Sequence, residues 1–176
     1  MIDLLRKRRS IRKYLNKAVD KASLDILIEA LLRSPSSLNN RPWEFVIVDK
    51  PELLSKLSKV KKYGSDFLAK SPLGIAVGAD SSKSDVWVED CSIASIFVQL
   101  AAESLGLGSC WIQIRERNYS DNKTSEEYIQ EILGIPGHIK VASIISIGWP
   151  DETKKPVPKN SLDYQKIRYN NYNAPE

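Results

Sequence analysis

The sequence predicts an α and β protein built in layers, folded as a single domain over residues 1–176. Short β-branched runs alternate along the chain with segments in which leucine and isoleucine recur at helical spacing. A length of 176 residues with 42% hydrophobic content suits one globular domain. No internal repeat or linker interrupts the chain before a polar, proline-rich extension at 150–176. The pattern alone leaves open whether the sheet is parallel or mixed.

The first half of the chain predicts two helices and two strands. Aliphatic residues recur at helical spacing in 20–33, where Asp20 can cap the helix. Residues 44–49 are β-branched and lie between two prolines, which is typical of a strand. A second helix is expected from Pro51. The continuous apolar run at 73–79 predicts a strand covered on both faces.

The second half predicts two more helices and two more strands. Residues 85–105 are expected to form the longest helix, and strands are expected at 109–114 and 141–148. A T-x-x-E capping box at Thr124 opens a helix that should end at Gly134. The buried stripe of the longest helix is expected to consist of Ile93, Ile96, Phe97, Leu100, Ala101 and Leu105.

Residue counts exclude several classes of protein. Cys91 and Cys110 are too few and too widely spaced for a disulfide framework or a zinc site, so we expect buried free thiols and no metal. The single histidine, His138, and the lack of a G-x-S-x-G motif argue against hydrolysis by a side-chain triad. The apolar runs at 93–102 and 141–149 are shorter than the roughly 18 residues of a membrane span. With no signal-peptide pattern, a cytoplasmic protein is expected.

The positive charge of the chain is concentrated near its N-terminus. The whole chain carries +4, but residues 1–17 hold seven Lys and Arg side chains against one acid, Asp3. This segment therefore carries +6 and residues 18–176 carry −2. Such a distribution argues against a general polyanion binder and indicates that this one segment meets an anionic group.

The basic segment R-R-S-I-R-K-Y, residues 8–14, is the first candidate site. Guanidinium groups bind phosphate oxygens and planar acceptor edges in bidentate fashion, and the serine hydroxyl adds a neutral donor. A phosphorylated ligand with a polar heterocycle would use this cluster well. On composition alone, a solvated helix end and a patch for nucleic acid or membrane surfaces remain alternatives.

Two other segments could contribute to a site. Residues 34–43, S-P-S-S-L-N-N-R-P-W, place small donors between a helix and a strand, although an ordinary connection would have a similar composition. In residues 103–113, E-S-L-G-L-G-S-C-W-I-Q, a helix ends at glycine and a strand begins at once, so backbone N–H groups near 111–113 could face a pocket. Neither a Rossmann nor a P-loop motif is present.

The order of these segments resembles the nitroreductase family of FMN-dependent oxidoreductases in its short, single-domain form. The family segment R-R-S-x-R is matched at 8–12, and P-S-S-x-N-x-Q-P-W is matched at 35–43. The segment L-A-A-x-x-L-G-L-G-x-x-W-I is matched at 100–112. A G-Y-P segment followed by K-P and a basic residue resembles 148–159. The matches run in register over nearly the whole chain, from residue 6 to about residue 162.

The resemblance implies a mixed α+β fold in which helices flank a mixed sheet. It further implies an intertwined homodimer whose C-terminal extension, 150–176, packs on the partner. FMN would be tightly bound in each of two clefts at the interface, with NAD(P)H as co-substrate. One FMN-binding domain is thus expected over 1–176, without a nucleic-acid or membrane partner.

By the same resemblance, the N-terminal cluster would hold the flavin. Arg8 and Ser10 would serve the phosphate and the ribityl chain, with Arg9 beside them. Arg12 would approach the N1/O2 edge of the ring, where a cation stabilises the negative charge of the reduced flavin. The expected cofactor-binding residues are Arg8, Arg9, Ser10, Arg12, Pro35, Ser36, Ser37, Asn39, Ile112, Gln113, Gly148, Lys155 and Lys159.

The other members of that set have separate roles by resemblance. The proline, serines and asparagine of the P-S-S-x-N segment would come from the other subunit and cover the flavin. The backbone of Ile112 and Gln113 would lie near N5, the hydride-accepting atom. Gly148 would allow close approach, and Lys159, with Lys155, would close on the phosphate. No side chain is expected to act as a nucleophile.

Three positions depart from the family pattern. The glutamine of Q-P-W is Arg41 here, which makes the mouth of the pocket more cationic and bears on contacts with the acceptor. The tyrosine of G-Y-P is Trp149, another aromatic residue. Residues 62–71 offer no match for the asparagine that longer members place near the flavin pyrimidine.

The resulting functional hypothesis is an FMN-dependent NAD(P)H oxidoreductase acting on nitro compounds, quinones or similar electrophiles by a ping-pong mechanism. A narrower reductase or dehalogenase with another physiological acceptor is an alternative, since a fold does not fix the substrate. A non-enzymatic FMN-binding protein and a polyanion-binding protein that uses the basic segment are the remaining alternatives.

Overall fold

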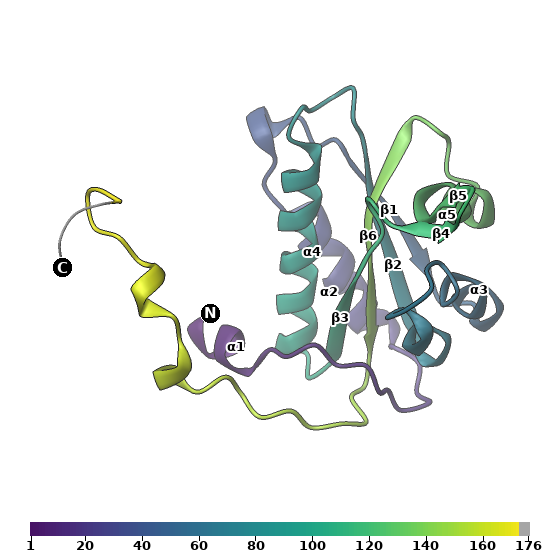
Figure 1. Ribbon diagram of the computed structural model, residues 1–176. Coiled ribbons are helices and arrows are strands. Elements are labelled where there is room, and N and C mark those ends of the chain that lie inside the picture. The colour runs from purple at the N-terminus through teal and green to yellow at the C-terminus, as the bar shows by residue number, and fades with distance from the viewer. Residues whose placement is uncertain (173–176) are drawn as a thin grey trace.

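In the computed structural model, which describes residues 1–172, one sheet lies between two layers of helices (Figure 1). Helices α2 (Lys21–Leu32) and α4 (Trp87–Ser104) cover one face, and α3 (Pro51–Leu57) and α5 (Ser125–Leu133) cover the other. The α+β fold class is therefore confirmed. The remaining elements are α1 (Ile2–Lys7), β4 (Asn118–Ser120), β5 (Lys123–Thr124) and four 3-10 turns, η1 (Ser37–Asn39), η2 (Asp66–Lys70), η3 (Lys159–Ser161) and η4 (Tyr164–Lys166).

The main sheet has four strands in the order β1-β2-β6-β3, and each neighbouring pair is antiparallel. Its strands are β1 (Trp43–Val48), β2 (Leu73–Asp80), β6 (Ile139–Gly148) and β3 (Gly108–Gln113). A parallel bridge between Ser10 and Ser109 adds the N-terminal segment to the outer edge of β3. Within residues 1–172 this bridge is the one parallel pairing. The relative strand direction, which the sequence pattern left open, is antiparallel throughout the main sheet.

The two central strands separate two apolar clusters. One cluster lies between the sheet and α2 with α4, and it contains Leu27, Ile75 and Val98. The other lies between the sheet and α3 with α5, and it contains Leu57 and Ile129. Residues 73–79 are buried throughout, so the prediction of a strand covered on both faces is confirmed.

The predicted helix ends are also confirmed. The carboxylate of Asp20 accepts the N–H of Ser23 at 2.9 Å and caps α2. The capping box of α5 is complete, because Thr124 accepts the N–H of Glu127 while the Glu127 side chain accepts the N–H of Thr124. Gly134 ends this helix with a left-handed φ of 65°, a conformation in which glycine has no steric cost.

The buried face of α4 differs from the predicted one. The helix packs on the sheet through a row of mostly small residues, which are Cys91, Ala94, Ser95, Val98 and Ala102. In the predicted stripe, Ile93 and Ile96 are only partly buried and Phe97 is 40% exposed. The prediction was wrong because α4 is apolar on two faces, and small side chains let its backbone approach the sheet closely. The larger residues therefore form a second apolar face that points away from the sheet.

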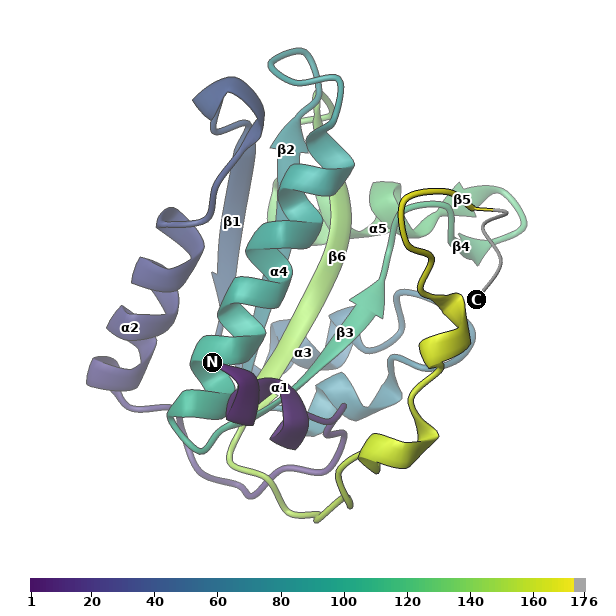
Figure 2. The ribbon, with the colours of Figure 1, turned by 90° about the vertical axis from the view of Figure 1, so that its left-hand side faces the viewer.

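After β6 the chain passes alongside residues 13–15 and then leaves the body of the protomer (Figures 1 and 2). The N–H of Asp151 donates to the Lys13 carbonyl at 2.9 Å. From residue 155 to residue 172 every side chain is exposed, including apolar ones such as Ile167 at 58%. Residues 155–172 thus contribute no fully buried apolar side chain to the core.

Candidate functional site

The R-R-S-I-R segment is held at the edge of the sheet by its backbone. The N–H of Ile11 donates to the Ser109 carbonyl at 2.9 Å, and the N–H of Leu15 donates to the Trp149 carbonyl at 2.9 Å. The Ile11 side chain is buried on Gly108, which leaves room for it by having no Cβ. These contacts fix the segment between the start of β3 and the chain that follows β6.

Tyr14 fixes the same segment from inside the protein. Its hydroxyl donates to the Ile11 carbonyl at 2.6 Å and lies 2.7 Å from the hydroxyl of Ser146 on β6. Burial raises the pKa of Tyr14 well above its ordinary value, with the hydrogen bond to Ser146 opposing the shift. The phenol is therefore neutral, and its hydrogen bonds join the basic segment at Ile11 to β6 at Ser146.

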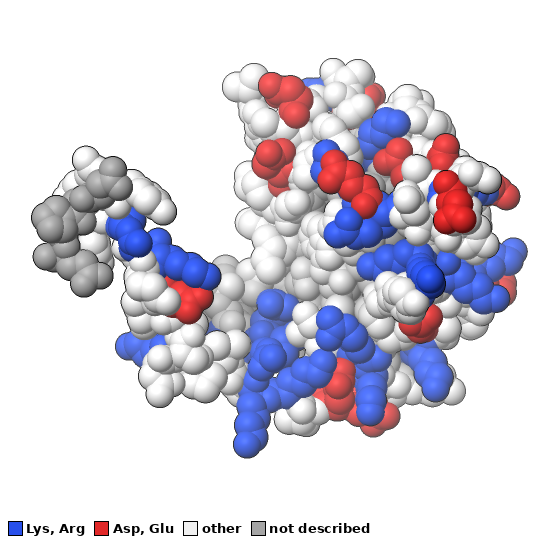
Figure 3. Space-filling model, in the orientation of Figure 1, with Lys and Arg blue, Asp and Glu red and all other residues white. Residues whose placement is uncertain are grey.

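The guanidinium groups of Arg8 and Arg12 form no ion pair with any residue in 1–172. The Arg12 guanidinium lies over the ring of Phe67, with its carbon 5.8 Å from the ring centre. Figure 3 shows Lys and Arg side chains gathered over the lower part of the molecule, where this segment runs. The site therefore presents positive charge that the protein itself does not neutralise.

Cys110 lies on β3, next to Ser109, the residue that pairs with Ser10, and its thiol is buried. Burial raises the pKa of Cys110, while Arg12, a hydrogen bond from Ser10, Lys154 and Arg8 act in the opposite direction. Ser10 is placed at this edge of β3 by its bridge to Ser109 and by the hydrogen bond from the Lys154 ammonium group to its carbonyl. Arg8, Ser10 and Arg12 therefore lie along one segment whose backbone is fixed beside the start of β3.

Residues near 62–71 also reach this region, although the sequence offered no match there. Phe67 supplies the ring beneath Arg12. Lys61 is partly buried, and burial followed by the nearby charge of Arg117 lowers its pKa. Lys61 lies in the same stretch of chain between α3 and β2 as Phe67. Sequence patterns missed the contact of Phe67 with Arg12 because it depends on the loop between α3 and β2.

The C-terminal segment contributes two residues that were not predicted. The ammonium group of Lys154 donates to the Ser10 carbonyl at 2.6 Å, and Glu152 accepts the backbone N–H groups of Arg12 and Lys13. Lys154 is adjacent to the predicted Lys155, so the predicted K-P segment indicated the right region of the chain.

Among the predicted residues, Arg9 donates to the main-chain carbonyl of Lys155 and is engaged in a structural contact. The side chains of Arg8, Arg9 and Lys159 line a cavity of about 640 Å³ between α1 and the C-terminal extension. The structure therefore brings the two predicted C-terminal lysines close to the N-terminal cluster.

The P-S-S-x-N segment lies at the opposite end of the protomer. Figures 1 and 2 show η1 near the N-terminal end of α4, whereas α1 lies near its C-terminal end. One protomer therefore does not bring Pro35, Ser36, Ser37 or Asn39 to Arg8 and its neighbours.

The loop that carries these residues has an unusual backbone that is held by side chains. Leu38, Asn39 and Arg41 have left-handed φ angles of 49°, 57° and 48°. The Arg41 backbone N–H donates to the Ser36 hydroxyl, and its Nε donates to Asn39 Oδ1, each at 2.8 Å. Clustered left-handed residues other than glycine persist only where the surroundings enforce them.

Asp90 anchors this loop to α4. Its carboxylate is 2% exposed, accepts the N–H of Ser37 at 2.8 Å and accepts the hydroxyl of Ser84 at 2.8 Å. Sequence analysis did not identify Asp90, although a lone acid on the buried face of a mainly apolar helix is a usable signal.

The remaining predicted residues lie on β3 and β6. Ile112 is fully buried, and the Gln113 side chain accepts from Trp111 Nε1 and donates to the Arg115 carbonyl, each at 2.9 Å. Gly148 is buried, and an added Cβ would lie 2.5 Å from Pro72 Cδ and 2.9 Å from Tyr14 Cδ1. Close packing of these two side chains is the reason that this position requires glycine.

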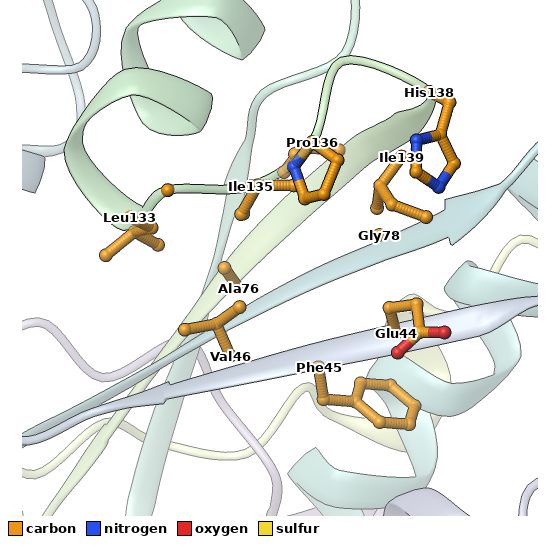
Figure 4. Close-up of a pocket in the computed structure, with 12 residues that line it drawn as sticks. Glu44, Phe45, Val46, Ala76, Gly78, Leu133, Ile135, Pro136, His138 and Ile139 are labelled. Atoms are coloured by element: carbon orange, nitrogen blue, oxygen red, sulfur yellow. The ribbon is translucent and has the colours of Figure 1, made fainter.

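His138 lies away from this cluster, at the mouth of a groove of about 310 Å³ (Figure 4). Its imidazole is exposed, and the Glu44 carboxylate lies across the groove. The side chains that line the groove are mostly aliphatic and include no serine, threonine or cysteine. The groove therefore offers no nucleophile for the histidine to activate.

Within residues 1–172, no helix is long and apolar enough to cross a membrane. The same part of the chain contains no cluster of three His, Cys, Asp or Glu residues that could hold a metal ion.

Comparison with known proteins finds that the chain is similar to nitroreductases and to an FMN reductase. The sequence model of the nitroreductase family matches residues 5–63 and 56–149. A solved structure, the FMN-dependent nitroreductase from Clostridium difficile R20291, has 50% identity and a TM-score of 0.96, covering 98% of this chain and 100% of that chain. A curated protein of Methanothermobacter thermautotrophicus, named as a candidate NADH dehydrogenase/NAD(P)H nitroreductase, is 36% identical over 155 residues, or 86% of this chain and 78% of the relative. The FMN reductase (NAD(P)H) of Bacillus subtilis (strain 168) is 28% identical over 194 residues, or 97% of this chain and 75% of the relative.

Proposed function

The chain belongs to the nitroreductase family, and from that premise we propose that it is an FMN-dependent oxidoreductase that uses NAD(P)H to reduce nitro compounds, quinones or similar electrophiles. The observation that carries this proposal is the segment that holds Arg8, Ser10 and Arg12 beside the start of β3, where neither guanidinium group has an acidic partner in residues 1–172. The names of the relatives, which include an FMN-dependent nitroreductase and an FMN reductase, support the choice of cofactor.

The side chains at this edge of the sheet fit FMN chemically. A guanidinium and a hydroxyl, from Arg8 and Ser10, match the oxygens of the phosphate and the ribityl chain. Lys159, which lines the same cavity as Arg8, and Lys155 can add charge at the phosphate. Arg12 extends from the same segment, with its charge available to an electron-rich ring edge.

Bound FMN would supply a two-electron carrier that accepts hydride from NAD(P)H and later yields the electrons to the acceptor, giving ping-pong kinetics. The protein's part is to bind, orient and stabilise charge. Arg12 would hold positive charge beside the N1/O2 edge, where reduction places negative charge. Ile112 and Gln113 would present backbone near N5, and Gly148 would keep its backbone close to the site. No nucleophilic side chain is needed, which agrees with the buried, high-pKa thiols of Cys91 and Cys110.

We further propose that the working enzyme is a homodimer. The second apolar face of α4, around Ile93, Ile96 and Phe97, is suited to burial against a second protomer. The exposed apolar side chains of residues 155–172 suit packing on the same partner. A partner would also supply the loop at Pro35–Asn39, which is far from Arg8 within one protomer.

The test uses the purified full-length protein. We expect a yellow protein of dimeric size in solution that oxidises NAD(P)H when a nitroaromatic or a quinone is present. Initial rates at several concentrations of both substrates should give the parallel double-reciprocal lines of a ping-pong mechanism. A colourless protein that takes up no added FMN would overturn the proposal. Rapid turnover of one unrelated acceptor, with slow nitroaromatic reduction, would instead indicate a narrower reductase.

A further inference from the structure

Glu152 is an acid within the most basic region of the protein. Its side chain is only 18% exposed. One oxygen, Oε1, accepts the backbone N–H of Arg12 at 2.5 Å and that of Lys13 at 3.2 Å. The same oxygen lies 3.3 Å from the ammonium nitrogen of Lys154.

Lys154 extends this contact to a third residue of the basic segment. Its ammonium group donates to the Ser10 carbonyl at 2.6 Å while it pairs with Glu152. The two side chains therefore hold the main chain of Ser10, Arg12 and Lys13 from one short stretch that follows β6.

The atoms used in these contacts matter for Arg12. An acid beside an arginine ordinarily pairs with the guanidinium group and neutralises it. Here the carboxylate is engaged by two backbone N–H groups and by Lys154, and the Arg12 guanidinium has no ion pair within residues 1–172. The backbone of Arg12 is thus fixed while its positive charge remains available.

We propose that Glu152 is a positioning residue for the flavin site, holding the backbone of Arg12 so that its guanidinium group stays oriented and unneutralised. This inference rests on the proposed function, since Arg12 is there assigned to the flavin. Lys154 supports Glu152 by orienting its carboxylate and by fixing the Ser10 carbonyl. In this role Glu152 acts through the Arg12 backbone and not by contact with substrate or cofactor.

The experiment compares Glu152→Ala and Glu152→Gln with the matched control Asp151→Ala. Asp151 is the neighbouring exposed acid, and within residues 1–172 its side chain makes no hydrogen bond or ion pair. Amide hydrogen exchange of residues 10–14 is measured in the protein freed of FMN, and FMN affinity and the reduction potential of the bound flavin are measured afterwards. Thermal unfolding of each variant establishes that it is folded.

We expect Glu152→Ala to accelerate exchange at Arg12 and Lys13 by about tenfold or more, because two hydrogen bonds to a charged acceptor are lost. The same variant should bind FMN about tenfold more weakly and lower the flavin potential. Glu152→Gln should recover most of the affinity at neutral pH, since its amide oxygen can still accept both N–H groups. Asp151→Ala should match the unmodified protein in every measurement.

Two results would overturn the proposal. One is unchanged amide exchange in Glu152→Ala; the other is faster exchange with unchanged FMN affinity and potential, which would leave Glu152 with a structural role only. Failure of the unmodified protein to bind FMN is a different result. It would contradict the proposed function, while the exchange data would still show whether Glu152 holds the Arg12 backbone.

Discussion

Ile11 packs directly on Gly108, so that a Cβ added to this glycine would lie 2.7 Å from Cβ of Ile11. The contact joins the centre of the R-R-S-I-R segment to the first residue of β3. Arg8, Ser10 and Arg12 lie on either side of Ile11 in the sequence. The positions of these three candidate flavin-binding residues therefore depend on Gly108 having no Cβ.

Replacing Gly108 with alanine should therefore displace the basic segment. We expect a loss of about 1–3 kcal/mol in the free energy of unfolding, as is typical of overpacking, together with weaker FMN binding. Urea unfolding and flavin fluorescence titration measure the two effects. Gly137→Ala is the matched control, because a Cβ at Gly137 would meet no atom within 4 Å. Equal effects of the two substitutions would contradict the packing argument.

Removing the Arg12 guanidinium should alter the flavin itself. We expect Arg12→Ala to weaken FMN binding by about ten- to a hundredfold, the range for a lost charged hydrogen bond, and to lower the reduction potential. Lys13→Ala is the control, since its exposed side chain makes no hydrogen bond or ion pair within residues 1–172. If both potential and affinity are unchanged in Arg12→Ala, the assignment of Arg12 to the flavin is wrong.

The anchor of the P-S-S-x-N loop can be tested at Asp90. Asp90→Ala leaves the N–H of Ser37 and the hydroxyl of Ser84 without their acceptor, so we expect about 1–3 kcal/mol of destabilisation in denaturant unfolding. Glu89→Ala serves as control, because Glu89 is exposed and lies in the same first turn of α4. A loss of similar size in Glu89→Ala would indicate a helix-dipole effect instead of a loop anchor.

Arg41 should influence the choice of acceptor. Its exposed guanidinium is oriented by Asn39 and has no ion pair in residues 1–172. If this loop borders the flavin of a partner, Arg41→Gln should raise the KM of a carboxylate-bearing acceptor about two- to fivefold, the range for one exposed ion pair. The KM of a neutral acceptor should stay constant. Steady-state kinetics with matched charged and neutral nitroaromatics, alongside the exposed Lys50→Gln control, would decide the point.

Glu152 should also produce a defined pH dependence of stability. The Arg12 N–H, followed by Lys154 and the Lys13 N–H, holds the pKa of Glu152 below its ordinary value. The Glu152 charge also helps to raise the pKa of Tyr14, and Lys7, Arg9 and Glu103 line the hollow beside Glu152. A carboxyl whose pKa is lowered by folding contributes stability that is complete above its unfolded pKa of about 4.3 and is lost as pH falls through the folded pKa.

The free energies of unfolding of the unmodified protein and of Glu152→Gln should accordingly differ by a constant amount above about pH 5. That difference should shrink as pH falls toward 3. A difference that is independent of pH over this range would show that the carboxylate charge is not responsible for it.

Local chemistry explains what could be predicted from the sequence. The Asp20 cap, the Thr124 capping box and the Gly134 stop involve residues within one turn of one another, so their spacing along the chain is enough to identify them. The buried run at 73–79 is equally local, since both faces of β2 are covered.

Prediction failed where two surfaces competed or where distant segments met. Hydrophobicity could not decide which apolar face of α4 packs on the sheet, because both faces are apolar. The face of small residues around Ala94 packs on the sheet, since small side chains let the two backbones approach closely, and Phe97 is exposed. The contact of the Lys154 ammonium group with the Ser10 carbonyl was not predicted, because it depends on the path of the backbone after β6. The expectation that the neighbouring Lys155 serves the phosphate stays a prediction.

The sequence by itself therefore determined the fold class, the capped helices, the basic segment and the family to which its motifs correspond. Only the tertiary structure decided that the segment of Arg8, Ser10 and Arg12 lies beside β3, that Phe67 lies against Arg12, and that Glu152 binds the Arg12 backbone while leaving its charge free. The physical reason is that caps and strand patterns involve neighbours along the chain. The charge of a site depends instead on which atom of a distant residue accepts which hydrogen bond, and only the folded backbone fixes that.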